Sequence, residues 1–261
     1  MSEAFTELGK RPPTAESLTS SSAYQRKPKL LTLGGDHSIA LPALRALKGV
    51  YDQPIAVVHF DAYLDTWHPA KYPSAWYGQD DGFVQSHFNH GSMFWMAAKE
   101  GLIANSSSVH AGLRTRLQSE EDNADDDQQG WVRISSDDID DIGTKGIISM
   151  IMDRVGTEMP VYLSIDIDVL DPGLAPGTGT PEPGGWTTRE LIRILRGIEG
   201  LNVVGADVVE VSPAYDGSTE STALAAAQVI YEIMTSMVKR GLLEQGRTDR
   251  ATDGSVRKDE L

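Results

Sequence analysis

Six short apolar runs constrain the fold of this chain more than any other feature of its sequence. They lie at residues 30–33, 55–60, 107–113, 131–134, 161–165 and 202–209. Near-continuous runs of Val, Ile and Leu at this length are typical of parallel strands that helices bury on both faces. We therefore expect a three-layer α/β fold with a doubly wound parallel sheet. A chain of 261 residues fits one large domain.

The segments between these runs predict the covering helices. Apolar residues at helical spacing place helices at residues 39–47, 93–103, 136–155, 187–198 and 222–239. Ser136 is expected to cap the third helix, and Thr187 with Glu190 forms a capping-box pattern at the start of the fourth. Residues 120–129 carry six acids and no apolar side chain beyond Ala124, so we expect a solvated loop there.

The two ends of the chain differ in composition from its middle. Residues 1–29 include a stretch rich in Ser, Pro and Lys, which predicts an irregular N-terminal segment. Residues 30–240 contain all the apolar runs and predict the α/β domain. Residues 241–261 are polar and predict a mobile C-terminal tail.

The charge balance excludes several classes of partner. Lys and Arg total 23 and Asp and Glu total 38, which gives a formal net charge of −15. This charge repels nucleic acid and anionic lipid, so we expect neither as a partner. The sequence has no apolar stretch long enough to span a membrane. It also has no cysteine for a disulfide, a thiolate metal site or a nucleophile.

Polar residues follow three of the apolar runs directly. Gly34–Ser38 (GGDHS) follows the first run, Asp61–Asp65 (DAYLD) follows the second, and Asp166-Ile167-Asp168 follows the fifth. Each string alone is typical of a turn or a cap. Because the carboxyl ends of parallel strands meet at one edge of a sheet, we expect these residues to converge. Converging carboxylates with one or two imidazoles suit Mn²⁺ and related divalent ions.

Five blocks of the sequence resemble the ureohydrolases, the arginase and agmatinase superfamily. GGDHS, DAxLD and SIDIDVLDP match the three metal motifs of that family in order, and NHGSMFW and DVVEVSPAYD match two further blocks. The resemblance extends from about residue 29 to about residue 239. The HGSMF string and the TPEPGGWTTREL stretch are similar to the agmatinase branch. The resemblance implies an arginase-like fold, with about six of the family's eight strands present here.

The resemblance also implies a centre of two Mn²⁺ ions. The residues that would hold the first ion are His37, Asp61, Asp65 and Asp166. The residues that would hold the second ion are Asp61, Asp166 and Asp168, so that Asp61 and Asp166 are shared. A water between two such ions is acidified enough to supply hydroxide, which would attack a guanidinium carbon.

Two further residues have roles in the family. His90 resembles the histidine that passes a proton to the leaving amine, and Glu210 resembles the carboxylate that pairs with the substrate guanidinium. The expected substrate is a small cationic guanidino compound, and the expected reaction is hydrolysis of agmatine to putrescine and urea. Family members are often oligomers, which implies a homo-oligomer.

One position departs from the family pattern. The family has Asp-Ala-His-x-Asp in its second motif, and Tyr63 occupies the place of that histidine, a ligand of the second ion. A phenol has a pKa near 10 and is a poor ligand at neutral pH, so we expect weak occupancy of the second site and low activity at modest Mn²⁺. His59 and His68 are near enough in sequence to substitute. His59 lies within an apolar run, which favours a place in the core or behind the ligands.

The ends of the chain bear on its extent and its compartment. The family has two strands before the GGDHS strand, and the first 29 residues contain neither. We therefore expect a truncated chain in which residues 30–33 form an exposed sheet edge. The last four residues spell KDEL, an ER-retention signal, whereas the start has no apolar signal-peptide core. The ending predicts the ER lumen or secretory pathway if a leader precedes the chain, and the cytoplasm otherwise.

Three functions remain open from the sequence. The first is an agmatinase-type hydrolase or a guanidinobutyrase-type variant, which would need Arg114 or Arg116 near its pocket to bind an acid. The second is a weak or inactive pseudoenzyme, which Tyr63 favours. The third is a deacetylase-like amidohydrolase, against which the DAxLD and VEVSP blocks argue. We expect no site role for the five tryptophans, for His87 or for His110, which lacks a partner at a recognisable spacing.

Overall fold

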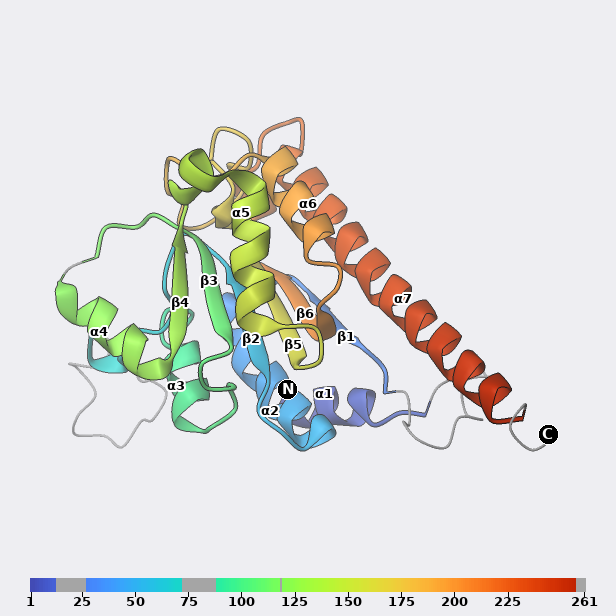
Figure 1. Ribbon diagram of the computed structural model, residues 1–261. Helices are drawn as coiled ribbons and strands as arrows, with labels where there is room; N and C mark the ends of the chain where they lie inside the picture. Colours follow the sequence, from blue (N-terminus) through green and yellow to red (C-terminus); the bar gives the residue numbers. More distant parts are fainter. Residues whose placement is uncertain (13–26, 72–87, 118, 257–261) are drawn as a thin grey trace.

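The computed structural model describes residues 1–12, 27–71, 88–117 and 119–256. Six strands form one all-parallel sheet in the order β1-β6-β5-β2-β3-β4 (Figure 1). The strands are β1 Leu30–Leu33, β2 Ala56–Phe60, β3 Ser108–Leu113, β4 Trp131–Ser135, β5 Pro160–Asp166 and β6 Asn202–Val209. The parallel sheet expected from the apolar runs is confirmed, and each strand begins and ends within one residue of its predicted bounds.

Helices cover both faces of the sheet, which confirms the three-layer arrangement. The helices on one face are α1 Ser2–Gly9, α2 Ala40–Tyr51 and α3 Met93–Lys99. The helices on the other face are α5 Asp138–Val155, α6 Thr188–Gly197 and α7 Ser221–Val256. Each face has its own apolar core, and β2 and β5 between them are buried at every residue. Burial on both faces explains why these strands are apolar along their whole length.

β1 lies at an edge of the sheet that the described residues form, as the sequence predicts. It pairs with β6 alone, and Leu33 at its end is 62% exposed. β4 forms the opposite edge, and α4 Glu120–Gln129 packs beside it (Figure 1). The carboxyl ends of β1, β2, β5 and β6 share one edge, and this arrangement positions the polar residues that follow each strand.

The prediction of a solvated loop at the position of α4 is wrong, because this acidic segment is a helix. Acids in its first turn are favoured by the helix dipole. Asp122 and Asp126 are buried, with 3% and 0% exposure. Each has a cationic partner: Lys71 lies 2.8 Å from Asp122, and Arg133 lies 2.8 Å from Asp126. Paired acids, rather than apolar side chains, attach this helix to the domain.

The capping predictions have different outcomes at α6 and α5. The capping box is confirmed at α6, where Thr187 N donates to Glu190 Oε2 at 2.8 Å and Glu190 N donates to Thr187 Oγ1 at 3.2 Å. Ser136 does not cap α5, which begins two residues later. The carboxylate of Asp138 instead accepts a hydrogen bond from Ser135 N at 2.7 Å, so the first residue of α5 satisfies the backbone before it.

Both ends of the chain hold more helix than the sequence predicts. α1 forms within the segment that the composition predicts to be irregular, because Phe5 packs against the core under α2. α7 continues past the predicted end at Lys239 to Val256. Within the described ranges, no helix combines the length and the apolar character needed to cross a bilayer.

We expect Gly112→Ala to lower the free energy of unfolding by at least about 2 kcal/mol. Gly112 has a φ of 98°, and a Cβ there would lie 2.5 Å from Val169 Cγ2. The matched control is Gly49→Ala, at an exposed position of α2 where a Cβ meets nothing within 4 Å. This control should raise the stability by up to about 1 kcal/mol. Urea unfolding followed by tryptophan fluorescence measures both, and equal stabilities would contradict the packing described.

Candidate metal centre

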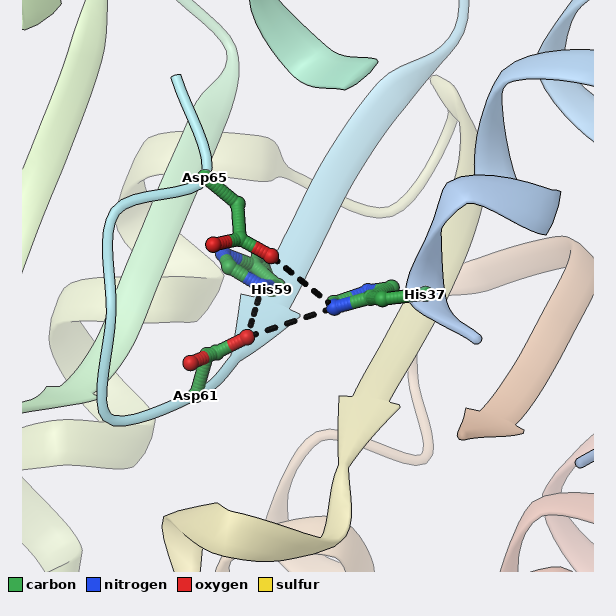
Figure 2. Close-up of side chains that lie close together, drawn as sticks. All are labelled: His37, His59, Asp61 and Asp65. Carbon is green, nitrogen blue, oxygen red and sulfur yellow. Dashed lines mark hydrogen bonds and ion pairs between the residues drawn. The ribbon is translucent and has the colours of Figure 1, made fainter. Parts of the chain in front are cut away.

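The polar residues that follow the strands meet at one edge of the sheet. His37 begins a short 3₁₀ helix after β1, Asp61 follows β2, and Asp166 is the last residue of β5. Asp65 lies in the loop after β2, and Figure 2 shows its carboxylate and that of Asp61 directed at the ring of His37. Segments far apart in the sequence come together here because the strands run in parallel.

Two groups of side chains in the described part of the chain could hold a metal ion. The first consists of His37, His59, Asp61 and Asp65, and the second consists of Asp61, Asp166 and Asp168. In each group all residues are buried and the ligand atoms lie within 4.8 Å of one another. Asp166 also approaches the first group, since its Oδ2 lies 3.4 Å from His37 Nδ1. The five candidate ligands therefore lie together, and His59 adjoins them, with its Nε2 2.9 Å from Asp61 Oδ2.

His37 is placed as a metal ligand would be. Its Nδ1 is buried and has no hydrogen-bond partner, although carboxylate oxygens of Asp65, Asp61 and Asp166 lie 3.1, 3.3 and 3.4 Å away. Its Nε2 is engaged by Ser164 Oγ at 2.8 Å. A cation between Nδ1 and the three carboxylates would satisfy all four groups, so this donor set fits a divalent metal ion.

A hydrogen-bonded chain behind His37 fixes its ring. Ser164 Oγ donates to Asp207 Oδ1 at 2.8 Å, and the Tyr162 hydroxyl donates to Asp207 Oδ2 at 2.5 Å. These residues of β5 and β6 have no exposed surface. Because the Ser164 proton goes to Asp207, the Ser164 oxygen accepts from His37 Nε2. His37 Nδ1 is then left with the lone pair that a metal ion needs.

The carboxyl groups of the centre disfavour one another's ionisation. Burial and the charge of Asp61 raise the pKa of Asp166 to about 7, and the same two causes raise the pKa of Asp65 well above its ordinary value. Burial and the charge of Asp166 raise the pKa of Asp168 likewise. Burial lowers the pKa of His37, but the adjoining Asp166, Asp61 and Asp65 outweigh it and raise that pKa. The centre thus attracts positive charge, which a divalent ion would supply.

Two residues of the site have a left-handed backbone. Asp65 has a φ of 55° and Glu210 has a φ of 59°. Such a conformation costs a non-glycine residue about 1 kcal/mol or more, so neighbouring contacts must hold it. At Glu210, the backbone N donates to the Gly35 carbonyl at 3.0 Å, and Oε1 accepts from His37 N at 2.6 Å. These two bonds join the loop after β6 to the loop after β1.

A pocket of about 470 Å³ opens over the centre. It is lined by the candidate ligands Asp61, Asp65, Asp166 and Asp168, and also by Asp36, His90 and Glu210. His90 lies on the turn before α3, and its half-exposed ring has Nδ1 3.6 Å from Asp36 Oδ2. The structure therefore brings His90 and Glu210 to the same pocket as the carboxylates.

Tyr63 lines this pocket with its hydroxyl directed at another acid. The hydroxyl donates to Glu182 Oε2 at 3.4 Å. Burial and the charge of Asp168 raise the pKa of Tyr63 to about 12, so the phenol is neutral at neutral pH. His68 lies outside both groups, with its ring packed edge-on against Trp95 at 4.6 Å. The second group therefore consists of carboxylates alone.

A buried histidine pair is missing from the sequence-based predictions. His59 Nδ1 lies 2.8 Å from His110 Nδ1, and His59 Nε2 lies 2.9 Å from Asp61 Oδ2. His110 Nε2 lies 3.1 Å from Asp126 Oδ1, so His110 has a partner that its sequence spacing does not indicate. The two histidines occupy paired positions of β2 and β3. The available signal was a single histidine inside each of two apolar runs.

The remaining candidates have varied surroundings. Arg114 donates to backbone carbonyls of Glu182 and Asp168, so it is fixed among the loops, whereas Arg116 is exposed and lines the pocket. Trp67 lines the pocket too, in contrast to the buried Trp131 and Trp186. His87 and Trp76 lie outside the described residues.

Comparison with known proteins identifies the family to which this chain belongs. The sequence profile of the arginase family matches residues 11–236. The chain belongs to the arginase family. It is 51% identical over 223 residues to putative agmatinase 3 of Schizosaccharomyces pombe. The aligned region covers 85% of this chain and 52% of that protein. It is 43% identical over 209 residues to the agmatinase of Chromobacterium violaceum. Here the aligned region covers 80% of this chain and 58% of that protein.

Solved structures of this family have the same fold. A hypothetical agmatinase from Burkholderia thailandensis superimposes with a TM-score of 0.71 at 37% identity, over 92% of this chain and 66% of that one. Proclavaminate amidino hydrolase from Streptomyces clavuligerus superimposes with a TM-score of 0.66 at 36% identity, over 79% of this chain and 63% of that one. The arginase-like fold is confirmed. This arginase-family chain spans about half the length of the curated relatives it matches.

We expect Mn²⁺ to raise the melting temperature of this arginase-family protein more at about pH 7.5 than at about pH 5. The raised pKa values of Asp166, Asp65 and Asp168 mean that the folded chain without metal binds more protons than the unfolded chain. Its stability therefore falls as the pH rises through about 4 to 7, and Mn²⁺ reverses this loss.

Differential scanning fluorimetry with and without Mn²⁺ measures this effect. Asp166→Asn removes a carboxylate that approaches both groups of candidate ligands, and it should abolish most of the rise in melting temperature that Mn²⁺ causes. A larger gain at the lower pH would contradict the competition between protons and metal.

Proposed function

We propose that this chain hydrolyses a guanidino compound, with agmatine as the first choice, and releases urea and an amine. The observation that carries the proposal is the composition of the pocket, where Glu210 and His90 adjoin the carboxylates of both metal-ligand groups. The agmatinases among the relatives support agmatine as the substrate, with putrescine as the second product.

The chemistry explains why such a pocket needs a metal centre. A guanidinium group resists hydrolysis because its positive charge is delocalised and its pKa is above 12. Two bound Mn²⁺ ions would make a water nucleophilic at neutral pH. The residues that would hold them are His37, Asp61, Asp65 and Asp166 for one ion and Asp61, Asp166 and Asp168 for the other. The rest of the pocket must then orient the substrate and supply a proton.

Glu210 is suited to orient the guanidinium group. One of its oxygens, Oε1, accepts from His37 N at 2.6 Å, which fixes the carboxylate before a substrate arrives. Glu210 still lines the pocket, so the carboxylate remains available to a cation there. Carboxylate and guanidinium groups form paired, charge-assisted hydrogen bonds, which would place the reacting carbon over the metal-ligand groups.

His90 is suited to supply the proton to the leaving nitrogen. The imidazole lies at the pocket and is half exposed, so it can exchange protons with solvent. Asp36 Oδ2 lies 3.6 Å from its Nδ1, close enough to orient the ring. When the C–N bond to the substrate chain breaks, the departing nitrogen would take a proton from His90 and leave as an amine.

Arg116 favours one alternative substrate. It is exposed at the pocket and could pair with the carboxylate of a guanidino acid, as in a guanidinobutyrase-type enzyme. Lys71 also lines the pocket, but its ammonium is engaged by Asp122 at 2.8 Å. The pocket has seven acids against these two bases, which supports the second cationic group of agmatine over a carboxylate.

We expect Tyr63→His to lower the Mn²⁺ concentration needed for urea release from agmatine by about 10-fold or more. The imidazole would add a nitrogen ligand to a group that otherwise has carboxylates alone. Tyr63→Phe, which removes the hydroxyl and adds no ligand, is the control and should give no gain. A colorimetric urea assay across a Mn²⁺ titration measures all three proteins. If all three are folded and release no urea at saturating Mn²⁺, the pseudoenzyme interpretation replaces the proposal.

We expect Glu210→Gln to raise the KM for agmatine about 10–100-fold, because a charge-assisted hydrogen bond contributes about 1.5–3 kcal/mol. Glu220→Gln is the matched control, since Glu220 also has a left-handed backbone with a φ of 52° but is exposed away from the pocket. Steady-state kinetics with agmatine and with guanidinobutyrate separate the two candidate substrates. An unchanged KM in Glu210→Gln would argue against its pairing with the guanidinium group.

A further inference from the structure

Two hydrogen-bonded arms connect the loop after β2 to a single carboxylate on α4. The loop begins at Asp61 and reaches Asp65, and both residues are candidate ligands of the first group. The carboxylate belongs to Asp126, which is fully buried. Nothing in the proposed chemistry requires this acid, which lies at the far end of a chain of side-chain contacts that starts at Asp61 and passes through His59 and His110.

The first arm begins at Asp61 and runs through the histidine pair. His59 Nε2 lies 2.9 Å from Asp61 Oδ2, and the two Nδ1 atoms of His59 and His110 lie 2.8 Å apart. His110 Nε2 lies 3.1 Å from Asp126 Oδ1. All four ring nitrogens therefore lie within hydrogen-bond distance of a partner, and both histidines have 0% exposure. The ring of Trp131 stacks on His110 at 4.0 Å and keeps that imidazole in its plane.

The second arm reaches the other end of the loop. Thr66 follows Asp65, the residue with a left-handed backbone, and is 2% exposed. Thr66 Oγ1 donates to Asp126 Oδ1 at 2.7 Å. Gln129, one turn further along α4, donates from Nε2 to the Thr66 carbonyl at 3.1 Å. α4 thus holds both the side chain and the backbone of the residue next to Asp65.

Asp126 is itself held in place from β4. Arg133 Nη1 lies 2.8 Å from Asp126 Oδ2, the oxygen that neither arm uses. Burial raises the pKa of Asp126, but His110, Thr66 and Arg133 outweigh it and lower that pKa. The carboxylate is therefore charged at neutral pH and can accept the hydrogen bonds of both arms.

We propose that Asp126 is a positioning residue for the metal centre, which holds Asp61 through His110 and His59 and holds Asp65 through Thr66. The inference rests on the proposed function, because it concerns how the ligands of that centre are aimed. Partners behind metal ligands typically change metal affinity about 10–100-fold when they are removed. Here a single carboxylate supports two of the candidate ligands, because one arm reaches Asp61 and the other reaches the residue next to Asp65.

The test compares Asp126→Asn with Asp127→Asn in the full chain. Asp127 lies on the same helix and pairs with the same Arg133 at 2.9 Å, but its side chain is 62% exposed. Both variants remove one negative charge, and only the first weakens the acceptor of the two arms, because the remaining amide oxygen is neutral and the amide nitrogen would face Arg133. Isothermal titration calorimetry with Mn²⁺ alone should show affinity about 10–100-fold weaker in Asp126→Asn and within about twofold of the unchanged chain in Asp127→Asn. Equal affinity in both, or a lower melting temperature of Asp126→Asn without loss of affinity, overturns the inference.

Thr66 provides a second pair of variants that disturb the packing less. Thr66→Val keeps the shape of the side chain and loses the hydroxyl, whereas Thr66→Ser keeps the hydroxyl. We expect weaker Mn²⁺ binding in Thr66→Val and binding near that of the unchanged chain in Thr66→Ser. Unchanged affinity in Thr66→Val overturns the second arm. Failure of the unchanged chain to bind Mn²⁺ overturns the proposed function and this inference together, whereas equal binding by every variant overturns the inference alone.

Discussion

Repulsion among four buried carboxyl groups is the constraint on which the rest of this structure depends. Asp61, Asp65, Asp166 and Asp168 lie close together beside the imidazoles of His37 and His59. Burying charges at this density is unfavourable unless a cation balances them. The sheet keeps them together because each lies at or just after the end of a strand whose position is fixed by neighbours on both faces. The apolar cores thus oppose the electrostatic cost of the site.

Much of the polar structure around the centre holds the candidate ligands rather than forming a surface for a substrate. Ser164 and Asp207 set the ring of His37 from behind, and Arg114 ties the loops after β3 and β5 through backbone carbonyls. The pocket side has a different composition, with exposed or half-exposed groups such as His90 and Arg116. The protein therefore has a buried, hydrogen-bonded layer under the centre and a solvated layer above it.

The fold and the candidate ligands could be predicted because both are local in the sequence. An apolar run predicts its strand wherever that strand lies in the sheet, and the residue that follows the strand reaches the common edge. The pairing of β2 with β3 is not local, so the contact of His59 with His110, 51 residues apart, could not be read from spacing. α4 was missed for a related reason. An acidic segment resembles a solvated loop until the fold supplies Arg133 and Thr66 as partners of Asp126.

The position of β1 at the edge of the described sheet has a consequence for local opening of the fold. Among the described strands, β1, which precedes His37, pairs on one side only, while Asp61 and Asp166 lie just after or at the end of strands in the interior of the sheet. Filling the centre would therefore link an edge strand to two interior strands. Opening of the edge and release of the ion then become one event, so the residence time of the metal and the lifetime of the β1–β6 hydrogen bonds should vary together.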